Sequence, residues 1–464
     1  MDIDFNLKIL SFKRKIFISK EWVRFGIILL TMLTSMIAAY WGPYRILILL
    51  IALLGGIAGA LVLLKQPNLG FILIFLGGMF VPYSGPGGVN ATVFVIALIT
   101  GVWLMDMLVV QRGFRFIKSR ALLPVAVMLA ISVIAFGMGQ VPWFVFANQA
   151  PLDAQAGGFA IFVLSLGCML VAAHLILDIK WLKILVWKFV GLGALYVFGR
   201  LAALPIDRLY QKGFTAGSMF WTWLVALAFA QAFFNTKLKM SARVLLYGIV
   251  LATLFVALVR GYDWKSGWVP PLVAIAVMMG LKYKRLVILA VPLALIAVGN
   301  LAVRLIASDR YSWGTRIDAW EIVLEISKVS PLFGLGFSNY YWYTPLFPIR
   351  GWLVNFNSHS QFIDLVAQVG VLGLVCFLWI FFEIGRLGWG LLKKQLPDGF
   401  AKAYAYGTFA GVIATLVGAF LGDWVLPFVY NVGLSGFRSS ILPWIFMGGL
   451  LAVEQLIIRK VRVV

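Results

Sequence analysis

The sequence contains few of the side chains that most often bind metals. Among its 464 residues are two histidines, His174 and His359, and two cysteines, Cys168 and Cys376. Both cysteines fall within apolar runs, where cysteine usually packs as a small hydrophobic residue. A zinc site or a tightly held divalent cation needs several ligands close together. The sequence therefore predicts no bound metal, and nothing in it indicates another cofactor.

Charged residues are also scarce. They make up 12% of the chain, whereas 62% of the residues are hydrophobic, and this balance excludes an ordinary soluble globular protein. Apolar runs long enough to cross a hydrocarbon core roughly 30 Å thick recur along the chain. We predict an all-α, polytopic transmembrane helix bundle of about 12–14 helices, in which residues 1–464 form a single integral-membrane domain.

Fourteen apolar runs define the predicted helices, and two of them, at 69–82 and 267–280, are short for a membrane span. The N-terminal stretch "MDIDFNLKILSFKRK" lacks the pattern of a cleavable signal peptide, so the first span is expected to be retained. The predicted spans are residues 24–41, 45–64, 69–82, 91–110, 121–137, 157–177, 181–204, 214–234, 242–259, 267–280, 286–306, 360–383, 402–420 and 441–458.

Acidic residues are outnumbered, with 17 Asp and Glu against 39 Lys and Arg, for a formal charge of +22. Most of the basic residues fall in connections on one side of the predicted bundle, such as "QRGFRFIKSR" and "KLKMSAR". Cytoplasmic loops are enriched in Lys and Arg in this way. We therefore predict a membrane protein with both termini in the cytoplasm, and we assign the charge to topology and membrane lipids, not to nucleic acid.

Several arginines break this pattern because they lie at the outer ends of predicted helices. Binding of an anionic ligand would explain them, and so would snorkelling or surface ion pairs, which are the common fate of a single arginine. These residues are Arg200, Arg208, Arg260, Arg304, Arg310, Arg316 and Arg350.

One long hydrophilic interruption, residues 307–358, is predicted to form a large extracytoplasmic loop. Within it, "WGTRIDAWEIVLEISKVSPLFGLGF" places Ile317, Trp320, Leu324 and Ser327 on one stripe, which predicts an amphipathic helix lying on the membrane surface. Pro331 and the glycines that follow end this helix. The aromatic stretch "SNYYWYTPLFPIRGW" is typical of an interfacial belt, and a platform for stacking sugars is the alternative.

His359 lies in "NFNSHSQFIDLVAQVGVLG", where a polar loop turns into an apolar run. Asp364 and Gln368 follow on one helical face, and polar residues in such a span normally face the bundle interior or a wet cavity. We predict that these three side chains form one polar file. The alternative is a helix cap at Asn357 or Ser358 with an incidental histidine beside it.

A histidine near the outer face can accept a proton near neutral pH, as activation of a hydroxyl requires. Arginine suits phosphate oxygens because its guanidinium is planar and permanently charged. A Walker phosphate loop and a serine-hydrolase elbow are absent. Together, a base and an arginine clamp facing the outer leaflet indicate glycosyl transfer from a polyprenyl diphosphate carrier.

Three segments resemble the O-antigen ligase and O-antigen polymerase superfamily of bacterial membrane glycosyltransferases, over residues 240–385. "FNSHSQFIDLVAQVGVLGLVCFLWIF" is similar to the family's Asn-Ser-His motif and the helix after it. "GTRIDAWEIVLEISKVSPLFGLGFSNYYWY" resembles its loop motif, an arginine before an amphipathic helix and a Pro-Leu-x-Gly-x-Gly turn. "ALVRGYDWKSGWVPPLVAI" resembles the segment in which an arginine ends a helix, although Val-Arg-Gly stands where Ser-Arg-Gly is more usual.

The resemblance implies metal-independent, inverting transfer of a glycan from undecaprenyl diphosphate to an acceptor hydroxyl at the periplasmic face. His359 matches the family's essential histidine, expected to act as general base or to orient the acceptor. Arg316 and Arg260 match arginines expected to hold the diphosphate. Asp364, Gln368, Arg310 and Arg304 are possible supporting residues.

The acceptor is left open between a lipid A core, as for a ligase, and a lipid-linked repeat unit, as for a polymerase; a related variant would glycosylate protein. A lipid-linked glycan flippase or secondary transporter is the alternative of another class, although such proteins often show repeated halves and broken helices. A peptidoglycan-type polymerase would instead use a carboxylate, Asp364 or Asp423, as base. We assign no role to Asp423 and Arg438 beyond an expected ion pair.

Overall fold

The computed structural model describes residues 33, 54–59, 61–63, 65–85, 88–283, 285, 310–394, 396 and 398–463. The chain divides into two compact units, Met1–Leu69 and Gly70–Val464. In the first unit, residues 54–59 and 61–63 are helical, within the predicted 45–64 span. Almost all of the predicted span 24–41, all of 286–306, and Arg304 lie outside the described residues.

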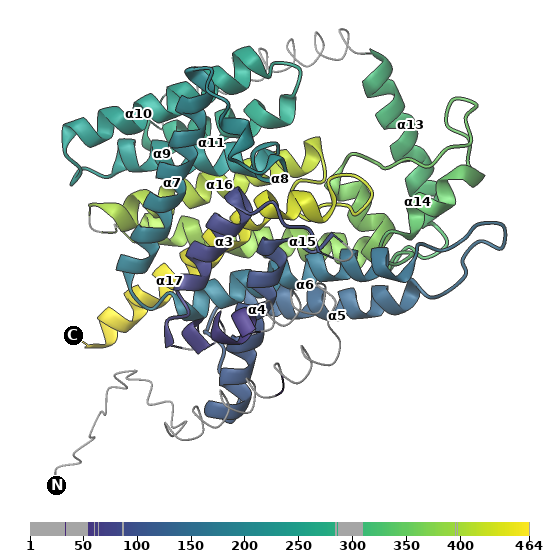
Figure 1. Ribbon diagram of the computed structural model, residues 1–464, viewed down its shortest axis with the longest axis horizontal. Coiled ribbons are helices and arrows are strands. Elements are labelled where there is room, and N and C mark those ends of the chain that lie inside the picture. Colours follow the sequence, from purple (N-terminus) through teal and green to yellow (C-terminus); the bar gives the residue numbers. More distant parts are fainter. Residues whose placement is uncertain are drawn as a thin grey trace. The chain divides into compact units, whose positions relative to one another are not determined.

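The second unit is built from helices, which confirms the predicted polytopic helical bundle (Figure 1). Among the described residues, seven helices are long and apolar enough to cross a membrane. Shorter apolar helices accompany them. In the described part of the second unit, the helices match the predicted spans to within a few residues, except that Gln361–Lys393 and Gly433–Val463 are longer than predicted. The helices are α3 (Leu69–Phe80), α4 (Ala91–Met105) with η2 (Asp106–Val110), α5 (Leu122–Met138), α6 (Leu152–Leu175), α7 (Ile179–Leu201), η3 (Ile206–Arg208), α8 (Lys212–Thr215), α9 (Ser218–Phe234), α10 (Met240–Phe255) with η4 (Val256–Arg260), α11 (Lys265–Lys282), α13 (Arg310–Ser327), α14 (Asn339–Tyr343), η5 (Thr344–Leu346), α15 (Gln361–Lys393), α16 (Phe400–Leu421) and α17 (Gly433–Val463).

Helix α9 is buried on nearly every side. It packs against α10, α11 and α16, which lie around it in Figure 1. Its sequence, SMFWTWLVALAFAQAFF, is apolar around the whole circumference, as expected of a helix enclosed by others. Gly407 of α16 lies against Ala226 and Ala230 of α9, so small residues allow the two backbones to approach closely.

The connections after α5, α7, η4 and α16 gather at one end of the unit, together with α13 and α14; we call this the loop end. Asn339 of α14 accepts the backbone N–H of Ala150 at 2.8 Å and donates to the carbonyl of Gly139 at 2.9 Å. The hydroxyl of Ser266, at the start of α11, donates to the carbonyl of Leu421 at 3.4 Å. These contacts bring residues from distant parts of the sequence to a common surface.

Helix α13 is the predicted amphipathic helix, and the predicted stripe contains both buried and exposed residues. Its buried side chains are Ala319, Val323, Ile326 and Ser327, whereas Ile317 and Leu324 are exposed. Val323 and Ile326 belong to a small hydrophobic core with Tyr340 and Tyr343 of α14 and with residues of α15. One apolar stripe of the helix is thus buried against protein, while Ile317 and Leu324 of the predicted stripe lie on the surface.

Helix α15 is broken at Gly370, where φ is +73° and ψ is −179°. This backbone conformation is essentially restricted to glycine. The break accommodates the turn of residues 331–336, whose glycine Gly334 also has a positive φ of +73°. Gly370 thus admits an irregular turn into the helix.

Four backbone hydrogen bonds join the 331–336 turn to the break. Leu335 and Gly336 donate to the carbonyls of Ala367 and Gln368, at 2.8 and 3.2 Å. In the other direction, Val371 and Leu372 donate to the carbonyls of Pro331 and Leu332, at 2.8 and 3.3 Å. Backbone groups left unpaired by the interrupted helix are thereby satisfied, as buried N–H and C=O groups must be.

Arg438 and Asp423 do not form the expected ion pair. The buried guanidinium of Arg438 donates to the carbonyls of Gly77 and Val81 at 3.0 and 2.9 Å, and also to those of Gly78 and Tyr83. These carbonyls lie at the C-terminal end of α3, where the last turn of a helix lacks intrahelical partners. Arg438 therefore caps α3, and a positive charge is favourable at that end of a helix.

Replacement of Gly370 by alanine should destabilise the protein. The new Cβ would collide with the carbonyl of Leu332, and the backbone conformation alone costs about 1–3 kcal/mol for a residue other than glycine. We expect a lower thermal unfolding midpoint in detergent. Gly385→Ala is the matched control, because Gly385 lies in the same helix with nothing near its added Cβ; equal midpoints for the two variants would contradict the assignment.

Candidate functional site

His359 lies in a left-handed turn immediately before α15, with φ at +50°. Histidine is one of the few residues other than glycine that is enriched in this conformation. Its backbone N–H donates to the side-chain oxygen of Asn357 at 3.2 Å. Ser360, and not Asn357 or Ser358, is the N-cap residue of α15. The turn leaves the histidine side chain exposed at the loop end while both neighbouring serines are buried.

Buried hydrogen bonds fix the turn that carries His359 on its inner side. The hydroxyl of Ser358 donates to Oδ1 of Asp364 at 2.8 Å, and the phenol of Tyr340 donates to the same oxygen. Burial and the neighbouring Asp364 carboxylate raise the pKa of Tyr340, so its phenol remains a donor. The indole of Trp320 in α13 donates to the carbonyl of Ser358 at 2.7 Å. Three elements, α13, α14 and α15, thus fix the backbone that carries His359.

Asn431, in the loop between α16 and α17, contacts the imidazole ring. Its Nδ2 lies 3.4 Å from Nδ1 of His359 and 2.6 Å from Oδ1 of Asp423. Oδ2 of Asp423 accepts the backbone N–H of Phe428 at 2.8 Å. Burial raises the pKa of Asp423, although these N–H donors oppose the rise. Two contacts therefore connect the buried carboxylate of Asp423, through Asn431, to the exposed ring of His359.

Arg316 of α13 lies close enough to His359 to affect its ionisation. Loss of hydration near the protein and the positive charge of Arg316 both lower the pKa of His359. The guanidinium also faces the ring of Trp313, 5.6 Å from its centroid, and donates to the carbonyl of Leu421 at 3.5 Å. Both effects disfavour the imidazolium and so favour the neutral ring of His359.

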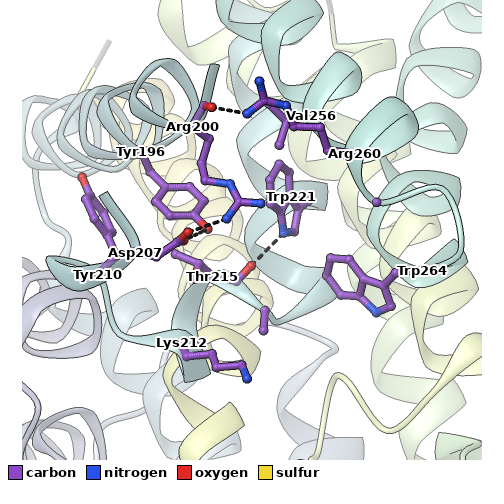
Figure 2. A pocket seen from close by; sticks show the side chains of 13 residues that line it. Tyr196, Arg200, Asp207, Tyr210, Lys212, Thr215, Trp221, Val256, Arg260 and Trp264 are labelled. Carbon is purple, nitrogen blue, oxygen red and sulfur yellow. Dashed lines mark hydrogen bonds and ion pairs between the residues drawn. The ribbon is translucent and has the colours of Figure 1, made fainter. Parts of the chain in front are cut away.

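A cavity of about 440 Å³ opens at the same end of the bundle, between the C-terminal ends of α7 and η4 and the start of α9 and α11 (Figure 2). Its size falls within the range of pockets for small ligands. Three cationic side chains and one carboxylate line it, so its formal charge is positive. Aromatic rings form much of the remaining wall. The polar and aromatic lining residues are Tyr196, Arg200, Asp207, Tyr210, Lys212, Thr215, Trp221, Arg260 and Trp264.

The cavity arginines are held by other groups of the protein. Arg200 forms an ion pair with Asp207, whose other oxygen accepts the phenol of Tyr196 at 2.8 Å. Arg260 donates to the carbonyls of Arg200 and Leu201 at the C-terminal end of α7. Figure 2 shows the two guanidinium groups along one wall, with Lys212 on the opposite side. A helix C-terminus stabilises a cation, so Arg260 keeps its position without a ligand.

The cavity and the histidine turn are neighbours at the loop end, but they are not one pocket. The lining of the cavity includes Arg260 and not Arg316 or His359. The two regions meet where Trp264, which lines the cavity, packs edge-on against Trp424 with ring centroids 5.8 Å apart. Trp424 directly follows Asp423 in the chain, so the aromatic pair separates the cavity from the Asp423–Asn431 pair.

The predicted polar file of His359, Asp364 and Gln368 was wrong. Asp364 is buried beneath the turn, and Gln368 accepts the backbone N–H of Ser338 at 3.3 Å. His359 instead faces Asn431, about seventy positions later, because its left-handed backbone turns the side chain away from the axis of α15. Both supporting residues shape the loop end and do not line the exposed surface.

The other arginines have varied surroundings. Arg350 forms an ion pair with Asp318 of α13 at 2.6 Å, and Arg310 is the first residue of α13.

Sequence reasoning did not find Asn431 or the cavity residues Asp207 and Lys212. Of the residues near these sites, Asp423 could be noticed in the sequence as an acidic residue at the outer end of a helix. Asn431, Asp207 and Lys212 could not, because their positions depend on contacts between segments distant in the sequence.

Within the described part of the chain, no three His, Cys, Asp or Glu side chains gather into a group that could hold a metal ion. Comparison of the sequence with models of known protein families and with curated protein sequences finds no match. The geometry of the loop end is therefore the basis for any statement about function.

His359 should titrate below 6.5, the usual pKa of histidine. Arg316→Gln removes the positive charge beside the ring and should raise the pKa, because the imidazolium is then less disfavoured. The measurement is a histidine NMR titration, which is simple because the chain has only two histidines. Arg350→Gln is the control, since Arg350 pairs with Asp318. A pKa that is unchanged in Arg316→Gln would refute the predicted coupling.

Proposed function

We propose that this protein is a membrane glycosyltransferase that moves a glycan from a polyprenyl diphosphate carrier to an acceptor hydroxyl, as in O-antigen ligases and polymerases. The observation that carries the proposal is the placement, at one end of an apolar bundle, of an exposed histidine beside Arg316 and next to a positively charged, aromatic cavity. On this proposal the loop end faces the periplasm, and the protein lies in the inner membrane of a bacterium with both termini in the cytoplasm.

The cavity suits the anionic headgroup of a lipid. Cationic groups at Arg200, Lys212 and Arg260 can neutralise phosphate oxygens, and arginine can bind them in a bidentate manner. Trp221 and Trp264 offer flat apolar faces to a sugar ring. Beside the cavity, the side chains of Val259 and Tyr262 are exposed, so an apolar chain attached to the headgroup could follow the outside of the bundle.

The reaction needs only groups that this site offers. The acceptor oxygen forms a bond to the anomeric carbon, while the bond from that carbon to the diphosphate oxygen breaks. The hydroxyl proton must leave, and negative charge develops on the departing diphosphate. Arginine side chains stabilise such charge in the transition state. His359, neutral and exposed, is positioned to contact one of the reacting oxygens, as base or as orienting group.

A lipid-linked glycan flippase or secondary transporter is the second candidate, and the broken helix α15 favours it. Transporters often bind ions or substrates at the unwound backbone of such helices. Here, however, four backbone hydrogen bonds from the 331–336 turn occupy the break. A peptidoglycan-type polymerase with a carboxylate base is less well supported, because Asp364 and Asp423 are both buried.

Replacement of His359 by asparagine should abolish transfer without unfolding the protein. Asparagine tolerates the left-handed turn but cannot act as an imidazole does, so a loss of roughly 10²- to 10⁴-fold is expected. The assay is release of polyprenyl diphosphate from a lipid-linked glycan by purified protein in detergent, with thermal unfolding as the control for folding. Transfer at the rate of the unmodified protein would remove His359 from the reaction.

The same assay separates the possible activities. Release coupled to a longer lipid-linked product would identify a polymerase, and release coupled to a glycosylated lipid A core would identify a ligase. Donor binding without release, whatever acceptor is added, would favour the transporter.

Arg260→Lys should weaken binding of the lipid diphosphate although the charge is retained, because lysine lacks the planar, bidentate geometry of arginine. We expect a loss of affinity of about tenfold, corresponding to roughly 1.4 kcal/mol. Quenching of Trp221 and Trp264 on titration with polyprenyl diphosphate would measure it. Arg208→Lys is the control, since Arg208 is exposed and outside the cavity lining. Equal affinities for both variants would argue that Arg260 is only structural.

A further inference from the structure

Asn431 lies between a carboxylate that can only accept hydrogen bonds and the imidazole of His359. One hydrogen of its Nδ2 points to Oδ1 of Asp423, 2.6 Å away, and the second is available to Nδ1 of His359 at 3.4 Å. If the amide were reversed, its oxygen would face the carboxylate oxygen and repel it. The orientation of the Asn431 amide is therefore set by Asp423.

Hydrogen-bond donors surround the carboxylate of Asp423 and offset part of the effect of burial, which raises its pKa. Its carboxylate accepts the backbone N–H of Phe428 at 2.8 Å, the amide of Asn431, and further backbone N–H groups of Asp423 itself and Val432. All of these partners are donors, and hydrogen bonds to a carboxylate stabilise the charged state.

The loop that carries Asn431 is fixed by aromatic contacts. Tyr430 stacks on Tyr341 with ring centroids 4.5 Å apart, and its phenol accepts the indole N–H of Trp342 at 2.8 Å. The backbone N–H of Asn431 donates to the carbonyl of Phe428 at 3.1 Å. With its backbone held and its amide oriented by Asp423, Asn431 presents a donor to His359.

We infer that Asn431 is a positioning residue that holds the neutral ring of His359 in the tautomer protonated at Nε2. An imidazole nitrogen that accepts a hydrogen bond carries no proton, so Nδ1 is the acceptor and Nε2 carries the hydrogen. The nitrogen left for a ligand is then a donor. The tautomer itself is independent of the proposed function.

The consequence for the reaction rests on the proposed function. His359 donates from Nε2 to an oxygen of the departing diphosphate and does not remove the hydroxyl proton. That proton passes to water on the acceptor side, while the new bond to the anomeric carbon forms and the bond to the diphosphate breaks on the opposite face. The ring ends the reaction with the same number of protons with which it began.

Nitrogen NMR of ¹⁵N-histidine-labelled protein at a pH above the titration of His359 tests the tautomer directly. The second histidine, His174, is an internal reference, because its two ring nitrogens have the opposite donor and acceptor roles. Nδ1 of His174 donates to the carbonyl of Leu170 at 2.7 Å, while its Nε2 accepts the N–H of Ile117 at 2.9 Å. We expect His359 protonated at Nε2 and His174 at Nδ1. A His359 ring protonated at Nδ1 would overturn the inference.

Asn431→Asp places an acceptor where the donor was, so the ring of His359 should become protonated at Nδ1 and transfer should fall at least about tenfold. Asn355→Asp is the control, because Asn355 is exposed in the segment before His359 and its amide donates to Tyr341. It adds the same charge and should change neither readout. A tautomer that does not respond to Asn431→Asp would refute the positioning role.

If the tautomer inverts while transfer is maintained, the donor role of Nε2 is refuted and a base role is favoured. Loss of transfer together with inversion supports the whole proposal. Failure of the unmodified protein to transfer to any acceptor would count against the proposed function, and the NMR result would still decide the tautomer.

Discussion

The loop end depends on the pairing between the 331–336 turn and the break in α15. A helix in an apolar bundle cannot expose unpaired backbone groups, so a break survives only where other groups satisfy it. Here the turn after α13 supplies them through Leu335, Gly336, Pro331 and Leu332. Glycine at 370 is required because no other residue readily adopts its conformation. The pairing ties the segment carrying Arg316 to the helix that His359 precedes.

From this joint, hydrogen bonds lead to the exposed ring. Tyr340 and Ser358 share Oδ1 of Asp364 beneath the turn, and Trp320 holds the Ser358 carbonyl from α13. On its other side His359 meets Asn431, whose loop rests on the aromatic residues of α14. Hydrogen bonds in a buried network of this kind are strengthened by the low local dielectric, and they fix the position of the turn. The ring is therefore positioned by buried groups that no substrate needs to touch.

Arginines at the loop end serve more than one purpose. Arg438 caps α3 and Arg350 pairs with Asp318, whereas Arg260 joins the end of α7 to the cavity wall. Arg316 acts on the ionisation of His359. The excess of arginine on this side thus has two explanations. Some arginines stabilise the C-terminal ends of helices, and others belong to a site that would attract an anion. Loss of hydration and the positive charge of Arg316 both lower the pKa of His359 and favour its neutral ring.

Composition and periodicity were sufficient to predict the helical bundle, the positions of its described spans and the amphipathic character of α13. These features are local, because a run of apolar residues or a turn is encoded by neighbours in sequence. The buried stripe of α13, the break at Gly370, the cavity and the contact between His359 and Asn431 depended on tertiary structure. Each is decided by a partner far away in the chain, and by the requirement that buried polar and backbone groups be paired, which a single sequence does not specify.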